Sequence, residues 1–138
     1  MLSGGNPTGG SNPSGTGSSI NYVGKHAYAY SGTFPQSTNA ATMLNFETGG
    51  QYIVGTLTCA GAVEFATPQS GGITGFHLSI NNEVIFLADT ETNENDQPGT
   101  ISVDLILAPY SRVKLENISN SNDANELTTA LFTGEVYA

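Results

Sequence analysis

Residues 75–88, GFHLSINNEVIFLA, carry the clearest structural signal in the sequence. Apolar and polar residues alternate through the first half of this stretch, which is the period-2 pattern of a half-buried β-strand. The pair Asn81-Asn82 suits a two-residue turn, because asparagine tolerates positive φ angles. A second run of apolar residues then returns. The stretch therefore predicts a β-hairpin.

A two-residue turn fixes the expected register of this hairpin, since the two strands then pair residue by residue. The expected pairs are Ile80 with Glu83, Leu78 with Ile85 and Phe76 with Leu87, all on the side of the core. The opposite face is expected to carry His77, Ser79, Val84 and Phe86. Large apolar side chains that point away from the core indicate a surface covered by another subunit or by a loop.

Alternating patterns predict further strands on both sides of the hairpin. They fall at His26–Phe34, Thr42–Glu47, Gln51–Cys59, Ala62–Ala66, Thr100–Leu107, Ser111–Ile118 and Thr128–Tyr137. A total of about eight short strands at this spacing is typical of an antiparallel β-sandwich or barrel. No window shows a convincing 3.6-residue period, so the sequence predicts an all-β fold with little helix.

The charge balance excludes several classes of partner. The chain has three Lys and Arg against twelve Asp and Glu, for a net charge of −9, and charged residues are 11% of the total. A protein that binds DNA or RNA needs basic residues to neutralise phosphates. We therefore expect no binding to nucleic acid and none to an anionic membrane surface.

Two regions of different composition divide the chain. Residues 1–19, MLSGGNPTGGSNPSGTGSS, contain no charge and little that is apolar, so they are expected to form a flexible arm. The arm is either a tail, native or left from cloning, or a segment that orders on a partner surface. Residues 20–138 are expected to form one β-sandwich domain. The sequence contains no run of about 20 apolar residues and no Sec-type signal peptide.

No motif in the sequence points to catalysis or to a cofactor. Cys59 lies in an apolar run, where a free cysteine usually acts as a small buried hydrophobe. His26 and His77 are the only histidines, and no nucleophile-elbow pattern accompanies them. Two carboxylates that meet only in the fold leave a glycoside hydrolase as a distant third hypothesis. We expect a protein that is not an enzyme and binds no cofactor.

The loop at residues 89–96 is a weak candidate for a metal site. It contains four carboxylates, whose oxygen atoms are the ligands that calcium prefers: Asp89, Glu91, Glu94 and Asp96. The spacing is not that of an EF-hand, because glycine is absent at the sixth position. A solvated loop between two strands is the favoured interpretation, and no metal is expected.

Two segments of the C-terminal half carry a family resemblance. They are the run DLILAPYSRV at residues 104–113 and the closing strand LFTGEVY at residues 131–137. With the long hairpin before them, they resemble the tumour-necrosis-factor-like jelly roll and the capsid decoration (cement) proteins of tailed phages. The resemblance covers roughly residues 26–137. The chain departs from secreted cytokines of this fold in lacking their disulfide pattern and a collagen-like stalk.

The resemblance implies a jelly-roll structural protein on the surface of a virion, assembled in the host cytoplasm. It also implies a homotrimer with aromatic and aliphatic contacts near the symmetry axis, bound to the major capsid protein or another virion lattice. The expected interface residues are Tyr28, Tyr30, His77, Val84, Phe86 and Tyr137. The alternative is a receptor- or glycan-recognition module, such as a phage fibre or head-fibre domain, that binds through its loops at 67–74, 89–99 or 119–127.

Overall fold

The computed structural model describes residues 19–64, 72–92 and 99–137, and in these residues it contains ten β-strands and no helix. Six strands form sheet A: β1 (Asn21–Val23), β2 (His26–Tyr30), β3 (Phe34–Gln36), β5 (Tyr52–Glu64), β8 (Gly99–Leu107) and β10 (Asp123–Tyr137). Four strands form sheet B: β4 (Ala41–Glu47), β6 (Gly72–Ile80), β7 (Glu83–Thr92) and β9 (Arg112–Ser119). The described part of the chain contains no helix of the length and hydropathy needed to cross a membrane.

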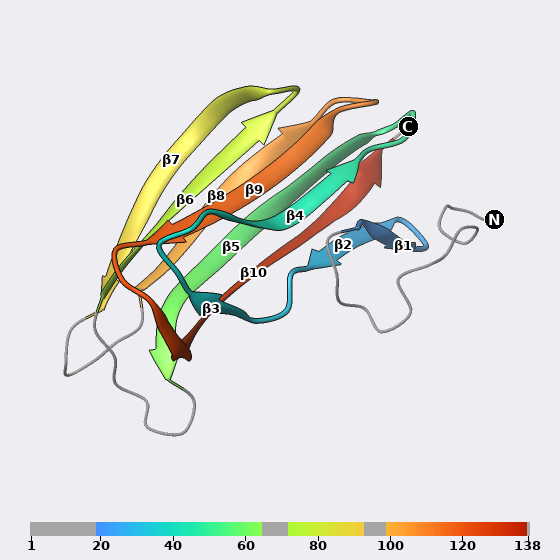
Figure 1. The fold of residues 1–138 in the computed structure, drawn as a ribbon. Coiled ribbons are helices and arrows are strands. Elements are labelled where there is room, and N and C mark those ends of the chain that lie inside the picture. Colours follow the sequence, from blue (N-terminus) through green and yellow to red (C-terminus); the bar gives the residue numbers. More distant parts are fainter. Residues whose placement is uncertain (1–18, 65–71, 93–98, 138) are drawn as a thin grey trace.

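The two sheets pack face to face as a sandwich with the strands along one long axis (Figure 1). Sheet A has the order β1-β2-β10-β5-β8, with β3 paired beside β10, and sheet B has the order β4-β9-β6-β7. Every pairing is antiparallel. Without the short β1 and β3, the eight remaining strands follow the connection pattern of a jelly roll. The expected all-β jelly-roll sandwich is confirmed.

A single apolar core lies between the sheets. Alternation along the strands turns one side chain in two inward, as the sequence pattern predicts. In β2, for example, Ala27 and Ala29 are buried while their neighbours face outward. The largest fully buried apolar side chains come from both sheets: Phe76, Phe132, Met43, Leu44, Ile53, Leu78, Leu107 and Leu115.

The β6–β7 hairpin contains a β-bulge that the sequence pattern did not predict. Leu78 pairs with Phe86 rather than with Ile85, so Ile85 is an extra residue in β7. The extra residue shifts the rest of β7 by one position, and a shift by one residue exchanges the two faces of a strand. The inward orientation expected for Ile85 and Leu87 is therefore wrong, because both are exposed. Phe86, expected to face outward, packs against the core.

Three other differences concern the ends of strands. The predicted strand His26–Phe34 is divided into β2 and β3, because Gly32 adopts a positive φ of 76° between them. The predicted strand Gln51–Cys59 and the described part of the predicted strand Ala62–Ala66 form the single long β5, and residues 65 and 66 lie outside the described residues. The predicted loop 119–127 is mostly strand, since β10 already begins at Asp123.

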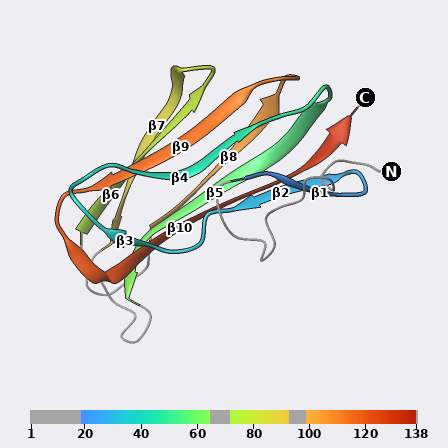
Figure 2. The same ribbon diagram turned by 45° about the vertical axis from the view of Figure 1, so that its right-hand side comes forward.

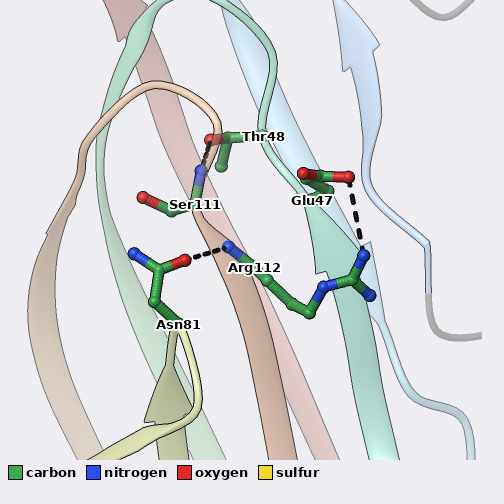
Figure 3. A network of polar contacts seen from close by, with 5 residues as sticks. All are labelled: Glu47, Thr48, Asn81, Ser111 and Arg112. Carbon is green, nitrogen blue, oxygen red and sulfur yellow. Dashed lines mark hydrogen bonds and ion pairs between the residues drawn. The ribbon is translucent and has the colours of Figure 1, made fainter.

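Polar contacts join three turns at one end of the sandwich (Figure 3). Thr48 Oγ1, in the β4–β5 turn, accepts a hydrogen bond of 2.8 Å from the backbone N–H of Ser111 in the β8–β9 turn. Asn81 Oδ1, in the β6–β7 turn, accepts one of 2.9 Å from the backbone N–H of Arg112. Arg112 also forms an ion pair of 3.7 Å with Glu47. Asn81 and Asn82 both adopt positive φ angles, as the turn requires.

Candidate functional site

Large exposed apolar side chains concentrate on two surfaces of the sandwich. The first is the outer face of sheet A, where they are Tyr30, Tyr52, Val54, Ile106, Leu131 and Tyr137. The second is the exposed side of β7, the edge strand of sheet B. Large exposed apolar patches on a soluble protein often mark sites of interaction with another molecule. These two surfaces are therefore the candidate functional sites.

A shallow groove of about 500 Å³ lies on the outer face of sheet A. We call it the tyrosine groove and define it by the outward side chains of β2, β5 and β10 that line it: His26, Tyr28, Tyr30, Val54, Thr56, Thr133 and Glu135. Its volume is in the range of small-ligand sites in proteins. Its form is more open than that of an enclosed cavity, so it suits a segment or side chain of a partner.

The sheet register explains the form of the groove. Tyr28 pairs with Thr133, and Thr133 pairs with Thr56. The small side chains of the two threonines therefore lie beside the large ring of Tyr28. The rings of Tyr28 and Tyr30 lie 5.0 Å apart between centroids, at an interplanar angle of 41°. Residues two apart in a strand share a face, so the two rings together form one wall of the groove. The paired glycines Gly55 and Gly134 form its backbone floor.

Two carboxylates give this face a negative charge. Glu135 lines the groove, and its Oε1 accepts a hydrogen bond of 3.0 Å from the hydroxyl of Tyr137. This hydrogen bond, together with the negative charge of Glu135, raises the pKa of Tyr137 above its usual value. Asp104 lies on β8 beyond the groove, where it accepts a hydrogen bond of 2.9 Å from Thr56 Oγ1. Hydroxyl groups thus orient both carboxylates.

The second surface, which we call the apolar edge, comprises Val84, Ile85 and Leu87 of β7. These side chains are 50%, 49% and 62% exposed, respectively. β7 and β8 are the last strands of their sheets, and they contact each other across the sandwich. Figure 2 shows the turn between β6 and β7 standing apart from the turn between β8 and β9. The bulge at Ile85 is what brings Leu87 to the surface.

The six predicted interface residues do not share one surface. Three of them, Tyr28, Tyr30 and Tyr137, lie on the outer face of sheet A. His77 and Val84 are exposed on sheet B, where His77 pairs with Glu116 of β9 and Leu87 of β7. Phe86 faces the core, as described above. The role of all six in self-association stays a prediction, and only the outward orientation expected for Phe86 is wrong.

The other candidate residues stand apart from both surfaces. Cys59 is buried at 3% exposure, and burial raises the pKa of its thiol to about 12, so it is not a reactive nucleophile. In the described part of the chain, no three His, Cys, Asp or Glu residues come together as a metal site. Asp89 is exposed on β7, but Glu94 and Asp96 lie outside the described residues, as does the arm at 1–18. The weak metal candidate thus stays untested.

Sequence reasoning missed the residues that give the groove its charge and the edge its apolar character. Glu135 and Thr56 are far apart in the sequence, and only the pairing of β5 with β10 brings them to one groove. Ile106, on the outer face of sheet A, could have been found, because it alternates with the inward Leu105 and Leu107. Leu87 could not, because its exposure depends on the bulge.

Comparisons with known proteins give a likeness in fold only. No family model matches the sequence, and no curated protein matches it. Among solved structures, a chain of the infectious bursal disease virus Gx strain is 11% identical, with a TM-score of 0.47, and the alignment covers 80% of this chain and 32% of the viral one. This chain thus spans about a third of the viral chain.

Two further structures have shorter chains. The C-terminal domain of EclA, a sugar-binding protein, is 17% identical over 73% of this chain and 74% of its own, with a TM-score of 0.41. The Eiger TNF of S. frugiperda is 8% identical over 82% of this chain and 94% of its own, with a TM-score of 0.42. At these identities and scores, the likeness assigns no partner or activity to the present chain.

Proposed function

We propose that this chain is a non-enzymatic structural protein that self-assembles, most simply as a trimer, and decorates the surface of a virus particle. The observation that carries the self-assembly is the apolar edge. The supporting evidence for the particle is the sequence resemblance to capsid decoration proteins, with a virion lattice such as the major capsid protein as the second partner. The proposal includes no nucleic acid and no membrane.

The apolar edge supports self-association because β7 is the edge strand of sheet B. Soluble proteins usually protect such strands with charges, prolines or covering loops, since an unpaired edge offers free backbone groups to another chain. Three of the four residues from Val84 to Leu87 are exposed and apolar. Permanent homo-oligomer interfaces are more apolar than transient ones. The apolar composition of this edge supports a permanent contact between copies of the chain.

The net charge of −9 fits a protein displayed in many copies. Like charges on the exterior keep assembled particles soluble and apart. Among the described residues, both ion pairs lie on the outer face of sheet B, Arg112 with Glu47 and Lys114 with Glu116. None of the three residues of the apolar edge is charged, so self-association there has no like-charge repulsion within the patch to overcome.

The test is the solution mass of the full-length protein and of one variant, measured by light scattering at two concentrations. Leu87→Asp places a charge in the apolar edge and should convert the oligomer to a folded monomer, whose melting temperature falls only by the stabilisation that association supplied. The matched control is Val23→Asp, the same kind of change at an exposed residue of β1, the strand at the opposite end of sheet A. The control should keep the mass of the parent. A parent that is monomeric at both concentrations contradicts the proposal.

The tyrosine groove favours a second candidate function, recognition of a receptor or a glycan. Aromatic rings with nearby hydroxyl and carboxylate groups are suited to both, because the rings supply contact area and the polar atoms supply orientation. A glycan array probed with the full-length protein separates the two candidates. Specific hits that disappear in Tyr28→Ala would favour recognition over a purely structural role.

A further inference from the structure

The tyrosine groove combines two kinds of group that attract a cation. The rings of Tyr28 and Tyr30 form its wall, and the carboxylate of Glu135 lies on the same surface. An ammonium or guanidinium group gains energy over the face of an aromatic ring within about 6 Å. It gains more from a charge-assisted hydrogen bond to a carboxylate.

The carboxylates on this face form no ion pair among the described residues, although His26 lies opposite Glu135 in the register of β2 and β10. The ion pairs in that part of the chain involve Glu47 and Glu116, and both are on sheet B. Glu135 and Asp104 instead accept hydrogen bonds from the neutral hydroxyls of Tyr137 and Thr56. Their negative charge is therefore not neutralised by a neighbouring Lys or Arg and remains available to a cation from outside.

The basic residues of the chain indicate that a cation bound in the groove would come from another protein. Of the three basic residues in the chain, Arg112 and Lys114 are already ion-paired on sheet B. The third, Lys25, lies in the turn between β1 and β2 beside the groove, but it forms no ion pair with a described carboxylate. A chain of net charge −9 also attracts a basic partner over a longer range than it attracts a neutral sugar.

We propose that the tyrosine groove binds an arginine or lysine side chain on a segment of a partner protein, held between the Tyr28–Tyr30 wall and the carboxylate of Glu135. The open form of the groove admits a side chain that projects from another chain. Hydrogen bonds from a guanidinium to Glu135 make arginine the preferred occupant. This inference concerns a different surface from the apolar edge, so it and the proposed self-association can fail independently.

The test uses three short capped peptides that differ at one position: arginine, lysine or citrulline, the neutral analogue of arginine. Binding to the full-length protein is measured by calorimetry at physiological salt, and NMR shifts of the tyrosine rings locate the site. The arginine peptide should bind best, and citrulline should weaken binding about tenfold, the equivalent of one charge-assisted hydrogen bond.

Three variants make the test specific to the groove. Glu135→Gln and Tyr28→Ala should each weaken binding of the arginine peptide by about fivefold or more. Asp89→Asn removes the same charge from an exposed position on sheet B and should change binding less than twofold. Equal losses in Glu135→Gln and Asp89→Asn, or no binding by any peptide, would overturn the proposal. So would binding of a neutral oligosaccharide that depends on Tyr28 while the arginine peptide does not bind.

Discussion

Gly55 of β5 and Gly134 of β10 lie directly opposite each other in sheet A, and the ring of Phe132 fills the space on the inner side of Gly55. A Cβ atom at Gly55 would lie 2.8 Å from Phe132 Cζ and would collide with the backbone oxygen of Thr133. A Cβ at Gly134 would lie 2.8 Å from the backbone oxygen of Val54. The lack of a Cβ at both positions thus lets β5 and β10 pair closely beside the buried ring of Phe132, on the core side of the sheet beneath the tyrosine groove.

Gly55→Ala should therefore destabilise the fold by about 1–3 kcal/mol, the usual cost of overpacking a core. Alanine elsewhere in a strand would be more favourable than glycine, so the sign of the effect identifies the close contact. The measurement is urea unfolding. Gly49→Ala is the control, because a Cβ there meets nothing within 4 Å, and its effect should stay within about 0.5 kcal/mol. Equal stability of the two variants would show that the strands separate easily.

The adjacent residues Phe86 and Leu87 give a second prediction, because the bulge sends them to opposite sides of β7. Phe86→Asp places a charge against the core and should lower the free energy of unfolding by about 2–4 kcal/mol. Leu87→Asp changes a residue that is 62% exposed and should leave the melting temperature within a few degrees of the parent. Thermal unfolding of both variants decides the matter. The reverse order of stabilities would mean that β7 pairs without the bulge.

This pair of residues also illustrates what the sequence could predict. The turn at Asn81-Asn82, the two strands and the inward set on β6 followed from residue type and period, because turns and alternation are local properties. The bulge arises from how β7 fits at the edge of sheet B, and the alternation of residues 83–87 contains no sign of it.

In the candidate sites, too, local features could be predicted from the sequence and long-range ones could not. Alternation places Tyr28 and Tyr30 on the outward face of β2, opposite the buried Ala27 and Ala29. The groove needs Glu135 as well, which lies more than a hundred residues away in sequence and becomes a neighbour only when β2 pairs with β10. A single sequence contains no record of such long-range pairing. The faces of strands were therefore predictable, whereas the groove was not.

Cys59 predicts a dependence of stability on alkaline pH. Burial raises the pKa of its thiol from 9.0 to about 12, so the unfolded chain loses the proton first as the pH rises. The contribution of this thiol to the free energy of unfolding is fully present below pH 9. It is lost as the pH rises toward 12, at up to about 1.4 kcal/mol per pH unit. Urea unfolding at pH 8 and pH 10.5 should show a larger loss for the parent than for Cys59→Ala. Parallel losses in the two proteins would rule out this contribution.

Two buried threonines predict opposite effects of the same substitution. Thr128 is fully buried, and its hydroxyl has no hydrogen-bond partner among the described residues. The hydroxyl of Thr48 is also buried, but it donates to the backbone oxygen of Ala108 at 2.9 Å and accepts from the N–H of Ser111 at 2.8 Å. A buried polar group without a partner costs free energy, whereas a satisfied one stabilises the fold and its loss leaves partners unpaired.

Thr128→Val should therefore stabilise the protein by about 1 kcal/mol, because it replaces an unsatisfied hydroxyl with a methyl group of similar size. Thr48→Val should destabilise it by about 1–2 kcal/mol, because the N–H of Ser111 loses its side-chain acceptor at the junction of two turns. Urea unfolding of both variants measures the difference, and each serves as the control for the other. A loss of stability in Thr128→Val similar to that in Thr48→Val would mean that the hydroxyl of Thr128 has a partner in solution, such as a bound water molecule between the sheets.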